Sequence, residues 1–128
     1  DYAHHPREIE ASLSSIREMW PDKRLTVAFQ PHLYSRTNDF YPEFAKSLNL
    51  ADQVILLDIY PAREQPIPGV TSGLIAERLT VPFVWVTKEE FPEYVKENVK
   101  EGIFMTVGAG DIDRFIPIFT EMFGGTDC

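Results

Sequence analysis

Val54-Ile55-Leu56-Leu57 is a short apolar run bounded by polar residues, and it is the strongest indication of the fold. An uninterrupted run of this length is typical of a parallel strand that is covered on both faces. Similar short apolar stretches lie at residues 25–29, 83–86 and 103–107. We therefore expect four buried strands.

Segments with apolar residues at helical spacing lie before, between and after these strands. Their apolar positions are Ile9, Leu13, Ile16 and Trp20; Phe40, Phe44 and Leu48; Leu74, Ile75 and Leu79; Tyr94, Val95 and Val99; and Ile112, Phe115, Phe119 and Met122. Alternation of helix and strand predicts an α/β fold: an open, mainly parallel sheet with helices on both faces.

Two signals mark helix starts. Thr87-x-x-Glu90 resembles a capping box, although Pro92 could move the start of that helix by some residues. Asp111, after Gly108-Ala109-Gly110, is a good N-cap for the last helix, in which Pro117 predicts a kink or a late start. The glycine turn resembles a phosphate-binding turn, but a tight turn with an N-cap explains it equally well.

The composition is that of one globular domain, with 128 residues of which 44% are hydrophobic. Its net charge of −8 argues against a nucleic-acid partner, because the phosphate backbone demands a basic face. No apolar run approaches the ~20 residues of a membrane span, so we expect no membrane partner. The one cysteine, Cys128, supports no disulfide framework, which suits a cytoplasmic protein.

Polar side chains gather in two stretches, Asp1-Tyr2-Ala3-His4-His5-Pro6 and Phe29-Gln30-Pro31-His32-Leu33-Tyr34-Ser35-Arg36-Thr37. Each falls where a strand is expected to give way to a helix. In an open α/β sheet such loops bind ligands. The chain opens with a loop of this kind, so we expect it to be part of a longer protein.

Three readings of His4, His5 and His32 stay open: a metal site, a structural role and a polar ligand pocket. Adjacent histidines point in different directions, and no helical pair or cysteine completes a zinc site, so we expect no metal. Arg36 stands at a helix start, where a cation opposes the helix dipole. It is either a solvated side chain or, together with the helix amides, a site for a carboxylate or phosphate.

The stretch from Tyr60 to Ser72 is longer than the ~2–6 residues of a typical connection between a strand and a helix. Long ordered loops are often functional, so Tyr60, Arg63, Glu64 and Ser72 are candidate ligand contacts. Arg63 and Glu64 could equally form a surface ion pair. The chain has no G-x-x-x-x-G-K-[ST] phosphate loop, and it holds no nucleophile that could carry a reaction unaided.

The two polar stretches, followed by Asp58-Ile59-Tyr60-Pro61-Ala62 and Gly108-Ala109-Gly110-Asp111-Ile112, occur in an order and spacing that match one family. The chain resembles the C-terminal domain of the bacterial Mur ligases, over essentially its whole length (residues 1–128). Among them it is most similar to members that join L-alanine to UDP-N-acetylmuramate.

The resemblance implies a Rossmann-like lid domain of a cytoplasmic enzyme of peptidoglycan precursor synthesis. The enzyme's N-terminal domain, absent from this chain, would bind the UDP-sugar. Its central domain, also absent, would bind ATP and Mg²⁺, and ligation would pass through an acyl-phosphate. By the same resemblance Asp1 would lie near the ATP ribose, and the amino-acid and acyl-phosphate end would be formed by Tyr2, His4, His32 and Arg36.

The chain departs from the family pattern at two positions. Many members have arginine at Leu33 and glycine at Arg63, so Arg63 is a candidate for the cation that Leu33 lacks. Two other functions stay open. One is a sibling ligase that adds a recycled peptide to the same sugar nucleotide, and the other is a non-catalytic nucleotide-binding module.

Overall fold

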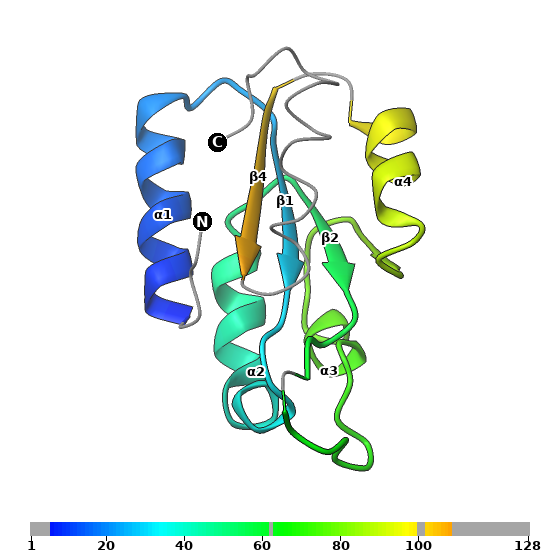
Figure 1. Ribbon diagram of the computed structural model, residues 1–128. Helices are drawn as coiled ribbons and strands as arrows, with labels where there is room; N and C mark the ends of the chain where they lie inside the picture. The colour runs from blue at the N-terminus through cyan, green and yellow to red at the C-terminus, as the bar shows by residue number, and fades with distance from the viewer. Residues whose placement is uncertain (1–5, 62, 100–101, 109–128) are drawn as a thin grey trace.

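A computed structural model describes residues 6–61, 63–99 and 102–108. These residues form a four-stranded sheet with the order β3-β2-β1-β4, in which every neighbouring pair is parallel. Figure 1 shows β2, β1 and β4 side by side and pointing the same way. The strands are β1 (Leu25–Gln30), β2 (Gln53–Leu57), β3 (Phe83–Val86) and β4 (Ile103–Gly108). The predicted strands and their parallel arrangement are confirmed.

The described helices are α1 (Pro6–Met19), α2 (Tyr34–Leu48), α3 (Gly73–Ala76) and α4 (Phe91–Asn98). Trp20, Leu79 and Val99, which we expected inside helices, follow the ends of α1, α3 and α4 instead. Trp20 still donates its amide to the carbonyl of Ile16 at 2.9 Å, as the last bond of the helical ladder. The helix predicted after Asp111 lies outside the described residues.

The bonds of the predicted capping box form, but they lie in the turn before α4, whose first helical residue is Phe91. The amide of Thr87 donates to Glu90 Oε1 at 2.9 Å, and the amide of Glu90 donates back to Thr87 Oγ1 at 3.2 Å. These are the two reciprocal bonds of a capping box. Pro92 therefore falls in the first turn of α4, where its missing N–H is tolerated.

Helices cover both faces of the sheet, as the apolar strands predicted. Successive side chains of β1 alternate between the faces. Val27 and Phe29 share one core with α1, α2 and α3, whereas Ala28 packs in a second core with α4. Connections through α2 and α3 therefore run on one face and the connection through α4 on the other. From β1 the chain adds β2 and β3 on one side and then returns to add β4 on the other, so the strand order reverses between β1 and β4. Folds of this kind bind their ligands at such a point.

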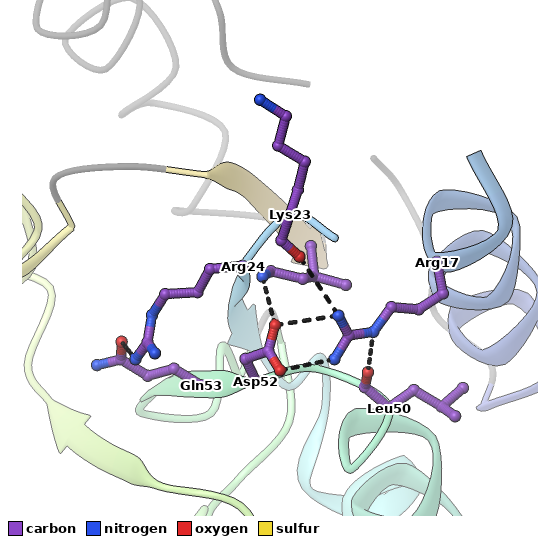
Figure 2. Close-up of polar contacts among 7 residues, drawn as sticks. Arg17, Lys23, Arg24, Leu50, Asp52 and Gln53 are labelled. Atoms are coloured by element: carbon purple, nitrogen blue, oxygen red, sulfur yellow. Dashed lines mark hydrogen bonds and ion pairs between the residues drawn. The ribbon is translucent and has the colours of Figure 1, made fainter. Parts of the chain in front are cut away.

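An ion-paired network ties α1 to the amino ends of β1 and β2 (Figure 2). Arg17 Nη1 and Nη2 donate to the two carboxylate oxygens of Asp52 at 3.0 and 2.8 Å, and its Nε donates to the carbonyl of Leu50 at 2.8 Å. Asp52 also accepts the amide of Leu25 at 2.7 Å. The Arg17 guanidinium lowers the pKa of the Asp52 carboxyl from its ordinary value, and the Leu25 amide adds to this.

Gly102 allows the turn into β4. Its φ is +86°, and a Cβ at this position would lie 2.2 Å from the carbonyl oxygen of Arg24. The same carbonyl accepts the amide of Ile103 at 2.8 Å, which sets the first pairing of β4 with β1. Only glycine fits this close approach.

Candidate functional site

The loops after β1 and β2 lie side by side at the carboxyl edge of the sheet. Tyr60 donates its amide to the carbonyl of Pro31 at 2.8 Å, and Leu33 donates its amide to the carbonyl of Tyr60 at 2.9 Å. His32 and Tyr60 form a parallel bridge, so the pairing of β1 with β2 continues past both strands. Two stretches singled out in the sequence are thereby joined.

The rings of His32 and Tyr60 stack on each other. Their centroids are 5.8 Å apart, and the ring planes differ by 14°. Both side chains are half-buried. The stack fixes the orientation of the imidazole at the edge where the fold places its ligands, so the structure brings together two residues that we predicted separately.

Leu33 has an unusual backbone conformation directly before α2. Its φ is +74° and its ψ is 139°, the only positive φ at a non-glycine residue in the described chain. Its carbonyl accepts both the amide of Thr37 at 3.2 Å and Thr37 Oγ1 at 2.8 Å. Such conformations are strained for side chains with a Cβ, and they cluster at functional sites. No sequence pattern pointed to this feature.

Glu64 reaches from the loop after β2 to the first turn of α2. Its Oε1 accepts the amide of Ser35 at 3.0 Å, and its Oε2 accepts the Ser35 hydroxyl at 2.5 Å. The Ser35 hydroxyl and then the Ser35 amide lower the pKa of the Glu64 carboxyl. The sequence allowed a surface pair of Arg63 with Glu64, but within the described residues the partner of Glu64 is Ser35 and no such pair forms.

Arg36 lies in the same first turn of α2, one residue after Ser35, and its side chain is partly exposed. Within residues 6–61, 63–99 and 102–108 it has neither an ion-pair nor a hydrogen-bond partner. The sequence left two readings of Arg36 open, a solvated side chain and an anion site shared with the helix amides. The amide of Ser35 already donates to Glu64, so the second reading depends mainly on the guanidinium of Arg36.

The remaining loop candidates occupy different environments. Ser72 is buried, and its hydroxyl donates to the carbonyl of Leu57 at 2.5 Å, which fastens the end of the loop to β2. Arg63 is exposed to solvent. Asp1, Tyr2, His4 and His5 lie outside the described residues, as does the turn after Gly108. α1 begins directly after them at Pro6, at the end of the sheet where the arrow of β1 ends (Figure 1).

A polar hollow of about 210 Å³ opens at the same edge, on the face covered by α4. Its lining is Gln30, Asp58, Ile59, Pro61, Lys88 and Glu89. Gln30 is only 3% exposed, although it is polar. Asp58 accepts the indole N–H of Trp85 at 2.8 Å. The sequence did not lead us to predict this hollow. The available signal was Gln30, a polar residue at the end of the otherwise mainly apolar strand β1.

The described part of the chain contains neither a metal cluster nor a helix that could span a membrane. None of its groups of His, Cys, Asp and Glu side chains could hold a metal ion. None of its helices is both long enough and apolar enough to cross a membrane. The carboxyl edge of the sheet carries the partly exposed side chain of Arg36 and the imidazole of His32, which stacks on Tyr60. A guanidinium in such a place suits an anionic group of a small ligand.

Comparisons with known proteins identify the family of the chain. Residues 1–110 match the family described as "Mur ligase, glutamate ligase domain". The chain is 55% identical over 119 residues to the UDP-N-acetylmuramate–L-alanine ligase of Phocaeicola vulgatus, covering 91% of the chain and 26% of that protein. For the enzyme of the same name from Porphyromonas gingivalis the identity is 50% over 117 residues, with 91% and 26% covered.

A solved structure has the same fold. The crystal structure of a UDP-N-acetylmuramate-alanine ligase from Thermotoga maritima superposes with a TM-score of 0.65 at 28% identity. The match covers 94% of this chain and 26% of that one. The chain thus spans about a quarter of the length of the relatives it matches.

Proposed function

The chain belongs to the Mur ligase family, and we propose that it is the C-terminal domain of an ATP-dependent enzyme that joins L-alanine to UDP-N-acetylmuramate. The observation that carries this proposal is the 55% identity to a ligase of that name across nearly the whole chain. The longer enzyme would act in peptidoglycan precursor synthesis in the cytoplasm.

The role proposed for this domain is to position the amino acid. Arg36 offers a cation at the start of α2, and its planar guanidinium can hold the alanine carboxylate with two parallel hydrogen bonds. His32, ordered by its stack on Tyr60, would lie beside the reacting end. Tyr2 and His4 would complete that end. Holding the amine against an activated carboxyl group, with water excluded, accelerates the reaction by orientation.

ATP and Mg²⁺ are proposed to bind mainly outside this chain. Mur ligases are ATP-dependent enzymes, and making an acyl-phosphate requires a bound triphosphate. The phosphate loop that would hold it is missing from this sequence, and the residues described here do not form a metal cluster. In the proposed enzyme a central domain therefore binds Mg-ATP, an N-terminal domain binds the UDP-sugar, and Asp1 contacts the ribose.

A substrate comparison with the complete protein tests this function. We expect phosphate release from ATP to depend on both UDP-N-acetylmuramate and L-alanine. The product should have the mass of these two substrates together, less one water molecule. A tripeptide in place of alanine should give at least tenfold less product. Preference for the tripeptide would identify the sibling ligase, and nucleotide binding with no ligation would indicate a binding module.

A further inference from the structure

We infer that Glu64 is a positioning residue of this site: its carboxylate caps α2 and thereby holds the turn that carries Arg36. The inference rests on the proposed function, in which Arg36 binds the carboxylate of alanine. It assigns to Glu64 an effect on alanine binding that acts through α2 and requires no contact between Glu64 and a ligand.

The first ground is that α2 lacks a cap of its own. The residue at its N-cap is Leu33, which makes no side-chain capping bond, and its first turn contains no acidic residue. The first amides of a helix have no partner within the helix and need one from elsewhere. Glu64, 29 positions beyond Ser35, supplies a carboxylate to both the amide and the hydroxyl of Ser35.

The second ground is that Glu64 is rigidly connected to the other half of the site. It follows Tyr60 by only four residues, and its amide donates to the carbonyl of Pro61 at 2.9 Å. Tyr60 in turn is bonded to the loop after β1 on both sides of His32. The backbone pairing, the ring stack and the Glu64 cap therefore join the same two loops at three points.

The third ground is the strain at Leu33. A positive φ in front of α2 persists only when the surrounding contacts hold it. The Glu64 cap lies two residues away, at Ser35, and the amide of Leu33 is held by Tyr60. Without the cap the first turn of α2 is expected to fray, and Arg36 would leave its place.

The test uses the complete ligase, with steady-state kinetics for alanine and for ATP. Glu64→Ala should raise the KM for alanine roughly tenfold or more, because displacing a positioning group by about 1 Å costs up to about a hundredfold. The kcat and the KM for ATP should change far less. Glu64→Gln keeps an acceptor for the Ser35 amide, so it should recover much of the lost affinity.

Two further variants separate positioning from stability. Glu90→Ala removes the capping box in the turn before α4, a helix that packs on the other face of the sheet from α2. This variant should lower the melting temperature while leaving the KM for alanine unchanged. The double variant Ser35→Ala/Glu64→Ala should have the same KM for alanine as Glu64→Ala alone, because the Ser35 hydroxyl has already lost its partner in the single variant.

A wild-type KM in Glu64→Ala, or an equal rise in Glu90→Ala, would overturn the role of Glu64 while alanine ligation by the wild-type enzyme still stands. A wild-type enzyme that turns over ATP without any response to alanine would instead overturn the proposed function, and with it the role given to Glu64.

Discussion

Replacing Asp52 by alanine would remove the centre of the network at the amino edge of the sheet (Figure 2). Two interactions are lost together: the bidentate pair with Arg17 and the bond from the amide of Leu25. Leu25 is completely buried, and Asp52 is the acceptor that its amide would lose. The effect should therefore exceed that of an ordinary surface ion pair.

The expected size follows from these two contributions. Leaving a buried N–H without a partner costs about 1–3 kcal/mol. The ion pair is about one-third exposed and contributes only ~0.2–1 kcal/mol. We expect Asp52→Ala to lower the free energy of unfolding by about 2–3 kcal/mol. Asp52→Asn still accepts from Leu25 and should lose about 1 kcal/mol.

Urea unfolding of this chain at several pH values measures both quantities. Contacts with Arg17 lower the folded-state pKa of Asp52 below its ordinary value of 3.8, so its stabilisation is present above pH 3.8 and is lost as the pH falls through the lowered value. The stability gap between wild type and Asp52→Asn should therefore shrink in acid. Asp22→Asn, an exposed carboxylate nearby, is the control with no expected effect.

Either of two results would refute this reasoning about Asp52. One is a loss below about 0.5 kcal/mol in Asp52→Ala, which would mean that the Leu25 amide finds another partner. The other is a gap between wild type and Asp52→Asn that stays constant down to pH 2, which would mean that the carboxylate charge contributes nothing.

Three other predictions concern Arg36, the pair of glycines with positive φ, and the isolated chain. Arg36→Ala in the complete enzyme should raise the KM for alanine at least about tenfold, equivalent to 1.4 kcal/mol, and unchanged KM and kcat would contradict its role. Gly102→Ala should destabilise the chain by at least about 2 kcal/mol, because strain at positive φ adds to the collision with the Arg24 carbonyl. Gly69→Ala, with φ +82° and open space around it, should cost only about 1 kcal/mol, and equal losses in thermal unfolding would argue against the collision. The isolated chain should fold, as circular dichroism can show, yet release no phosphate from ATP with UDP-N-acetylmuramate and alanine. Turnover above background would place the chemistry in this domain.

The class of fold could be predicted from the sequence because the signals for it are local. An apolar run such as Val54–Leu57 is buried on both faces wherever it lies in a sheet, and Thr87-x-x-Glu90 forms its two bonds within one turn. The motifs at His32 and Arg36 likewise predicted a ligand site at the carboxyl edge of the sheet, because a loop that follows a parallel strand must begin at that edge.

Only the tertiary structure decided how the site is held together. Glu64 caps a helix that begins 30 residues before it, and Gly102 is required because Arg24 passes 2.2 Å from the place of its Cβ. Neither relationship leaves a pattern at a fixed spacing, since each depends on which strands pair and in which register. The sequence of a short segment specifies its own conformation and buried face, whereas the contacts of a side chain with distant segments exist only after the sheet has brought those segments together.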